Sequence, residues 1–236
     1  MPIERPQARQ PFIKAALLVV SSLAYLAGSG CAGPHPLGGP PNIQPQEPNV
    51  VSLDPQNWYI FYSAGMPNHP SSESNAAWSF EFPMSQTGGH VNYVQTPFRA
   101  TSIPNSVTIK FRIQRITPEQ FVIADPTDTP PPTVRLFFER QDDDFSNPNG
   151  RWWSYASAYD LSRASVFDTW ITVPFTPNQW DNANGKGGQL NPRAFDAALK
   201  NIGWVGITFG GQRLAGHGVA INSDSAKYIL VDYTVD

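Results

Sequence analysis

The chain has 236 residues, a formal net charge of −3, and 18 Gly and 24 Pro residues, a composition typical of a β-rich globular protein with many turns. Its few Lys and Arg residues are not clustered as phosphate binding requires, which argues against a nucleic-acid partner. The single cysteine, Cys31, excludes an intrachain disulfide and a cysteine-based zinc site. The sequence contains no nucleophile elbow, phosphate-binding loop or clustered metal ligands, so it indicates a fold and a location and leaves activity as a hypothesis.

The N-terminus has the pattern of an export signal. Arg5, Arg9 and Lys14 precede the apolar run 15–28, which is too short to span a membrane comfortably. The stretch 26–31, LAGSGC, resembles a bacterial lipobox, in which the cysteine becomes the lipidated first residue, although Gly28 stands where a lipobox usually has Leu. We therefore expect residues 1–31 to be a signal peptide with lipidation at Cys31. The alternatives are cleavage near Ala32 with release of the protein, or an uncleaved anchor.

Residues 32–49 are so rich in Pro and Gly that neither a helix nor a β-ladder can persist there. We expect this segment to be an extended tether, which would hold a folded domain of residues 50–236 away from a membrane surface.

Within the domain, short alternating or continuous apolar runs separated by turn residues predict many strands. The segment 58–62 is apolar on both faces, as in a central strand, and 78–82 is expected to form a hairpin with 90–95 across Gly88 and Gly89. The tryptophans outside the hairpin described next are expected in the core: Trp58, Trp78, Trp170, Trp180 and Trp204. The predicted strands are 58–62, 78–82, 90–95, 106–114, 119–123, 134–139, 151–155, 169–175, 204–209 and 227–235.

The stretch 134–155 is the centre of this prediction. Val134, Leu136 and Phe138 alternate with Arg135, Phe137 and Glu139, which is typical of a strand with two different faces. Residues 142–150 have the composition of a reversing loop, and RWWSY returns as a second strand. The segment is therefore predicted to be a hairpin with an acidic tip.

One helix is predicted, over residues 192–202. Asn191 can cap it, Pro192 suits its first position, Phe195 and Leu199 repeat at helical spacing, and Gly203 follows its end. Many short strands with one short helix predict an all-β fold, an antiparallel β-sandwich of the jelly-roll type.

The C-terminal half carries a resemblance to a known family. The segments FFERQDDDFS, GRWWS, GWVGITFGG and the final strand YILVD are similar to those of galactose-binding-like jelly rolls, which include many carbohydrate-binding modules. The resemblance implies a jelly roll, often with a structural Ca²⁺, that binds glycans through aromatic and polar side chains.

The residues themselves also favour sugar binding at the hairpin, because a pyranose needs an aromatic surface for its C–H face and polar groups for its hydroxyls. Trp152 and Trp153 point to opposite faces of a strand, so at most one of them can face a ligand. The candidate ligand-binding residues are Arg140, Asp142, Asp144, Asn147, Trp152, Trp153 and Tyr155.

Three alternatives stay open at this stage. Asp142, Asp144 and Asn147 supply hard oxygen donors that suit Ca²⁺, but their spacing differs from an EF-hand, and a solvated acidic turn explains them as well. A glycoside hydrolase or polysaccharide lyase would need paired carboxylates, for which Glu81, Glu139 and Asp142 are available by type. A structural or protein-binding envelope lipoprotein without glycan binding fits the same leader and tether. We favour an exported, lipid-anchored glycan-binding protein without catalytic activity or a required cofactor.

The lipobox resemblance makes a direct prediction. Replacing Cys31 with Ser should move the protein from the membrane fraction to the soluble fraction, because no thiol remains to carry the lipid. Fractionation of the wild-type and C31S proteins measures this, and an unchanged distribution would show that Cys31 is not the anchor.

Overall fold

A computed structural model of the chain describes residues 51–236 except 101, 116–119, 164–165 and 214. The predicted signal peptide, Cys31 and the tether lie outside the described residues, so they stay predictions. In the described part, no helix is long and apolar enough to cross a membrane.

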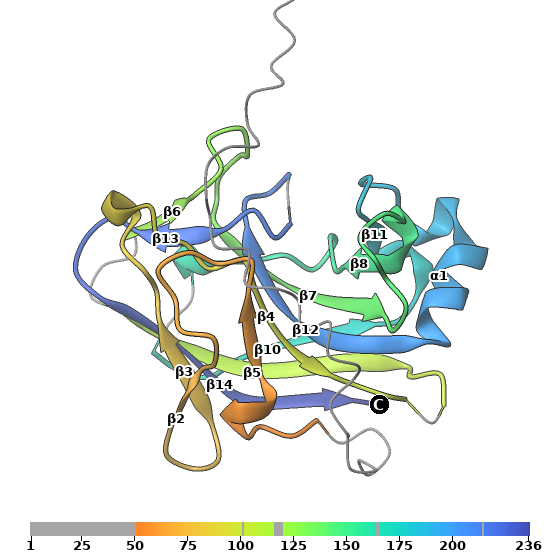
Figure 1. The fold of residues 1–236 in the computed structure, drawn as a ribbon, viewed down its shortest axis with the longest axis horizontal. Helices are drawn as coiled ribbons and strands as arrows, with labels where there is room; N and C mark the ends of the chain where they lie inside the picture. Colours follow the sequence, from red (N-terminus) through yellow and green to blue (C-terminus); the bar gives the residue numbers. More distant parts are fainter. Residues whose placement is uncertain (1–50, 101, 116–119, 164–165, 214) are drawn as a thin grey trace, which may run out of the picture. The chain divides into compact units, whose positions relative to one another are not determined.

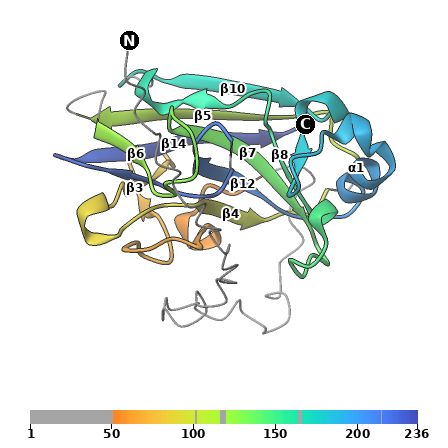
Figure 2. The same cartoon turned by 90° about the horizontal axis from the view of Figure 1, so that it is seen from above.

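Two antiparallel sheets form a sandwich, and Figures 1 and 2 show their strands running across the domain in two layers. The larger sheet has the order β1-β4-β12-β7-β8-β11, with β9 paired to β7. Its strands are β1 (Tyr59–Phe61), β4 (Tyr93–Pro97), β12 (Ile202–Gly210), β7 (Thr133–Arg140), β8 (Arg151–Trp153), β11 (Asp181–Asn182) and β9 (Tyr159–Asp160).

The smaller sheet has the order β10-β5-β14-β3-β2, and a separate pair of strands joins β13 to β6. These strands are β10 (Thr169–Pro174), β5 (Ser106–Arg115), β14 (Ala226–Val235), β3 (Trp78–Glu81), β2 (Ser71–Ser72), β13 (Val219–Ile221) and β6 (Phe121–Ile123). The β6 prediction began at residue 119, which lies outside the described residues.

The core lies between the two sheets and follows the predicted alternation. On β5, Ile109 and Phe111 are fully buried while Lys110 between them is partly exposed. On β7, Leu136 and Phe138 are fully buried and belong to the same core. The predicted fold class, an antiparallel jelly-roll sandwich with one short helix, is confirmed.

The predicted central hairpin is also present, because β7 and β8 pair in antiparallel register with Phe138 opposite Trp152 and Phe137 opposite Trp153. Trp152 is 0% exposed and its ring lies 5.1 Å from that of Phe195. Its indole nitrogen donates to the carbonyl of Asn149 at 3.0 Å. Trp152 is therefore the core member of the pair, which leaves Trp153 as the one of the two that can face a ligand.

The helix α1 (Pro192–Leu199) begins where it was predicted and ends earlier than residue 202, because Ile202 already belongs to β12. It lies at one end of the sandwich beside β8 and packs against β7 (Figures 1 and 2). The Asn191 side chain does not cap the helix but donates to Asn149 Oδ1 at 2.9 Å.

Two predictions about strand pairing are wrong. β3 pairs with β14 and β2, whereas β4 pairs with β1 and β12 in the other sheet, so residues 78–82 and 90–95 form no hairpin. β1 lies at the end of its sheet's strand order and is not central. Tyr59, on β1, packs against Trp204 and His69 at centroid distances of 5.9 and 4.8 Å. This packing explains why the segment carries an aromatic residue on each face.

The tryptophans outside the hairpin divide between core and surface. Trp58, Trp78 and Trp180 are buried, as expected, whereas Trp204 is only partly buried. Trp170 is 58% exposed, which corrects the prediction, because it lies on the outward face of the edge strand β10 with Lys110 Nζ 5.0 Å from its ring.

The contrast between Trp152 and Trp170 gives a stability prediction. Trp152→Ala should lower the free energy of unfolding by about 3–5 kcal/mol, because it leaves a cavity beside Phe195. Trp170→Ala, the matched surface control, should change it by less than about 0.5 kcal/mol. Urea denaturation measures both, and equal losses would contradict this assignment of core and surface.

Candidate binding site

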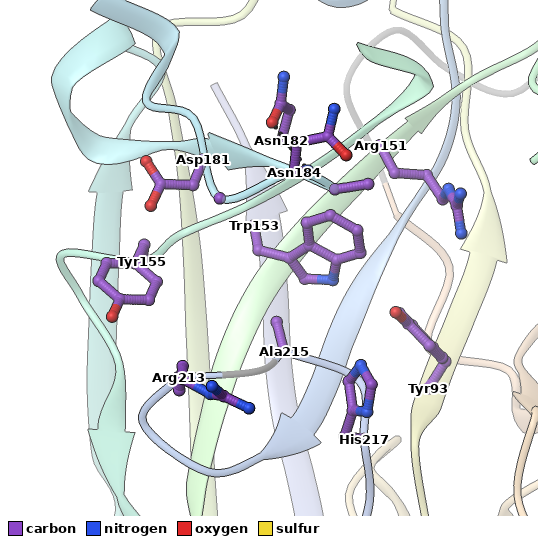
Figure 3. A pocket seen from close by; sticks show the side chains of 12 residues that line it. Tyr93, Arg151, Trp153, Tyr155, Asp181, Asn182, Asn184, Arg213, Ala215 and His217 are labelled. Atoms are coloured by element: carbon purple, nitrogen blue, oxygen red, sulfur yellow. Dashed lines mark hydrogen bonds between the residues drawn. The ribbon is translucent and has the colours of Figure 1, made fainter. Parts of the chain in front are cut away.

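A cavity of about 590 Å³ opens on the outward face of the larger sheet, within the size range of small-molecule sites. Figure 3 shows Trp153 at its centre, Asp181, Asn182 and Asn184 on one side, and Arg213, Ala215 and His217 on the other. Its lining residues are Tyr93, Arg151, Trp153, Tyr155, Asp181, Asn182, Ala183, Asn184, Gly185, Arg213, Ala215 and His217.

The floor of the cavity comes from aromatic residues on the outward face of the sheet. Trp153 is 7% exposed, and its cross-strand neighbour Phe137 lies 5.2 Å, edge to face, from Tyr93. Burial raises the pKa of Tyr93 to about 12, although its interactions with Trp153 and Thr208 favour the ionised form. The phenol is therefore neutral over the physiological range and can donate a hydrogen bond.

The loop beside this floor approaches Tyr93 so closely that only glycine fits. Gly216 has a φ of +71°, and a Cβ at this position would lie 2.0 Å from the Tyr93 hydroxyl oxygen. Both the left-handed backbone and the close contact therefore require glycine.

Two buried charged groups hold the start of the same loop. Arg135, on β7, donates to the carbonyls of Gly211 and Gln212 at 2.8 and 2.9 Å. The carboxylate of Asp128 accepts from the backbone N–H groups of Gly211 and Arg213 at 2.6 and 3.1 Å. The four hydrogen bonds fix the backbone that carries one wall of the cavity.

The polar side chains of this wall are also positioned by the 125–128 turn. Arg213 donates to the carbonyl of Thr127 at 2.9 Å, and the His217 ring nitrogen Nδ1 lies 2.8 Å from Asp125 Oδ2. The pKa of Asp125 is lowered to about 2, first by the backbone N–H and hydroxyl of Thr127 and then by His217. Asp125 is thus a permanent acceptor that orients the imidazole.

The opposite wall is a tight turn that begins at β11. The Asn182 side-chain oxygen accepts from the backbone N–H groups of Asn184 and Lys186 at 3.0 and 3.1 Å, and its amide donates to Asn149 Oδ1 at 2.8 Å. Gly185 takes a φ of +65°. Asp181 lies at the base of the turn, where burial raises its pKa and the charge of Arg135 partly offsets that effect.

The two ends of the cavity are Tyr155 and Arg151, which Figure 3 shows on opposite sides of Trp153. Tyr155 is 46% exposed, and the guanidinium carbon of Arg135 lies 5.3 Å from its ring centroid. Arg151 forms an ion pair with the buried carboxylate of Asp143, with Nε 3.0 Å from Oδ2.

A second carboxyl lies buried close to this ion pair. Glu139, on β7, lies opposite Arg151 of β8 and is 4% exposed. Burial first, and then the charge of Asp143, raise the pKa of Glu139 to about 8 against the opposing effect of Arg151. Burial also raises the pKa of Asp143, against the effect of Arg151. Two carboxyls therefore share one guanidinium, and a proton on Glu139 relieves their repulsion.

The structure separates the residues that the sequence grouped at the hairpin. Trp153 and Tyr155 line the large cavity, while Trp152 is in the core. The other four candidates line a separate hollow of about 240 Å³ at the hairpin tip: Arg140, Asp142, Asp144 and Asn147.

The polar groups of that hollow have partners within the tip. Asp142 pairs with Arg140 at 2.7 Å, Asp144 accepts from the Ser146 hydroxyl at 2.6 Å, and Asn147 Oδ1 accepts from the Asn149 N–H at 2.9 Å. Among the described residues, no group of three or more His, Cys, Asp and Glu side chains is arranged to hold a metal ion.

Several cavity residues were not selected from the sequence: Tyr93, Arg151, Asp181, Asn182, Asn184, Arg213 and His217. Apart from Tyr93 and Arg151, the sequence marked these residues only through loop composition, because they come from the Asn- and Gly-rich segment 178–189 and the Gly-rich segment 210–218, which carry the two walls. Composition marks them as loops, but only strand pairing brings them together.

Comparisons with known proteins add a fold likeness. No family model matches the chain, and no match was found among curated proteins. Among solved structures, a xylan-binding module CBM15 aligns with 78% of this chain and 98% of its own, at 14% identity and a TM-score of 0.39. A likeness at this level does not establish a shared function.

The buried carboxyl of Glu139 makes stability depend on pH. Its folded pKa of about 8 exceeds the ordinary value of 4.5, so between these values the folded protein retains a proton that the unfolded chain releases. This contribution therefore favours folding at low pH and is lost as the pH rises toward about 8. Glu139→Gln cannot ionise, so the variant's melting temperature should fall less than that of the wild type between about pH 5 and about pH 8. Parallel melting curves would contradict the buried, protonated carboxyl.

Proposed function

We propose that the domain binds carbohydrate in the large cavity without cleaving it, and that the chain is exported and anchored through a lipid on Cys31. The observation that carries the proposal is that one cavity combines the rings of Trp153 and Tyr155 with polar side chains on both walls. Large apolar cavities with a few convergent polar groups are typical ligand sites.

The chemistry of these groups suits a sugar. The exposed ring of Tyr155 offers a flat apolar surface for the C–H face of a pyranose. Asp181 supplies acceptors, Arg213 supplies donors, and Asn184 supplies both, so neighbouring hydroxyls of one ring can each find a partner.

The walls are held in place before a ligand arrives. Arg135 and Asp128 fix one wall, and the Asn182 side chain fixes the other. A preformed site loses little conformational entropy on binding, which increases the affinity available from a few hydrogen bonds and one stacked ring.

The carboxyl groups favour binding over hydrolysis. Asp181 is the one carboxylate among the described residues that line the cavity, and glycosidases commonly use two, placed on either side of the bond that breaks. The pair formed by Glu139 and Asp143 is buried, since Glu139 is 4% exposed and the Asp143 side chain 0%. A substrate in the cavity would not reach that pair.

The proposed location supports the same function. The export signal, the cysteine at its end and the Pro- and Gly-rich segment 32–49 together favour a domain displayed on a tether. Surface polysaccharide would then be within reach of the cavity.

A glycan array on the full chain, followed by titration of the best ligand, tests the proposal. Tyr155→Ala should weaken binding about fivefold or more, because one stacking ring is lost. Trp170→Ala is the matched control, an exposed aromatic residue on the other sheet, and should leave affinity unchanged.

Thermal melting checks that both variants fold. A wild-type chain that binds none of a diverse set of glycans would leave an envelope lipoprotein of structural role as the better assignment. Equal losses in the two variants would place the binding site outside the cavity.

A further inference from the structure

We propose that the cavity is one part of a longer groove, and that the ligand is a polysaccharide chain with a second contact at Tyr62. This inference rests on the proposed function and extends it to the length of the ligand. Tyr62 follows β1 and is 54% exposed, although a tyrosine ring is a large apolar group. It does not line the cavity, so it would be an additional contact.

A continuous series of contacts joins Tyr62 to the cavity. The ring of Phe145, at the hairpin tip, meets the ring of Tyr62 edge to face at 5.7 Å. The guanidinium carbon of Arg151 lies 4.3 Å from the centroid of Phe145. Arg151 and Trp153 both line the cavity, so Arg151 and Phe145 connect the cavity to Tyr62.

The backbone holds these two aromatic residues in place. Tyr62 and Phe145 have φ angles of +49° and +66°, in the left-handed region that bulky side chains rarely adopt. Next to Tyr62, the Ser63 hydroxyl donates to the Phe61 carbonyl at 3.0 Å and accepts from the Asn92 N–H at 2.9 Å. Strained residues that persist in a folded protein are often held for function.

The exposed tyrosines lie toward opposite edges of the larger sheet. Tyr62 follows β1, the first strand in its order, and Tyr155 follows β8, the last but one. Figure 3 shows Arg151 on the far side of Trp153 from Tyr155, with its guanidinium directed away from Tyr155. Phe145 and Tyr62 continue the contacts from that guanidinium. A ligand that contacts both tyrosines must therefore extend beyond the cavity, which a chain of sugar rings does and a single sugar does not.

The charges along this path favour uncharged glycans as probes. Arg151 is paired with Asp143, and His217 lies 2.8 Å from Asp125. Arg213 and Asp181 carry opposite charges on facing walls. The groove thus presents no excess of one charge that would select a polyanion.

Chain-length dependence tests the inference. Calorimetric titration of the full chain would use the disaccharides and hexasaccharides of xylan, cellulose, mannan and chitin. A hexasaccharide should bind more tightly than its disaccharide. Tyr62→Gly, which suits the positive φ and removes the ring, should weaken the hexasaccharide about five- to tenfold and leave the disaccharide unchanged. Tyr62→Phe should keep most of the hexasaccharide affinity, and Tyr155→Ala should weaken both ligands.

The outcomes separate this inference from the proposed function. Equal wild-type affinity for the two lengths would overturn the groove without using any variant, while cavity binding would stand. A Tyr62→Gly variant that melts like the wild type and binds both lengths as the wild type does would also overturn it. Absence of binding to every ligand would overturn the proposed function, and the groove with it.

Discussion

The candidate site depends on one buried cation, the guanidinium of Arg135 on the outward face of β7. Burial lowers the pKa of Arg135, which reflects the free energy lost when the cation leaves water. The carbonyls of Gly211 and Gln212 and the ring of Tyr155 replace that water. The two carbonyls begin the loop that carries one wall of the cavity, and Tyr155 is one of its ends, so moving this loop away would leave a buried charge unsatisfied.

The hairpin of β7 and β8 joins this site to the core of the sandwich. Phe138 and Trp152 face inward and pack with α1, while Phe137 and Trp153 face outward and form the floor. Both faces of β7 are buried, since every residue from Thr133 to Glu139 is buried. The floor residues Phe137 and Trp153 are therefore nearly as buried as the core beneath them, at 1% and 7% exposure.

Local patterns predicted the strands and the start of the helix because alternation and capping act over a few residues. Strand partners are set by distant contacts, so the sequence placed residues 78–82 and 90–95 in a hairpin although the structure puts them in different sheets. The site residues show the same difference between local patterns, which the sequence reveals, and distant contacts, which it does not. Trp153 and Tyr155 were found because they adjoin a recognisable turn, whereas Asp181 and Arg213 join them only through the pairing of β11 with β8 and the anchoring of a loop by Arg135.

The turn 182–186 has an evolutionary consequence. Its hydrogen bonds run from the Asn182 side chain to its own backbone and to Asn149, so the wall is held without the side chains of Ala183 and Asn184. Gly185 is restricted by its positive φ, but the two positions before it face the cavity with no role in the core. Related proteins could exchange those two side chains to change ligand preference while inheriting the scaffold intact, which makes this turn the place where new selectivities can arise at the least cost in stability.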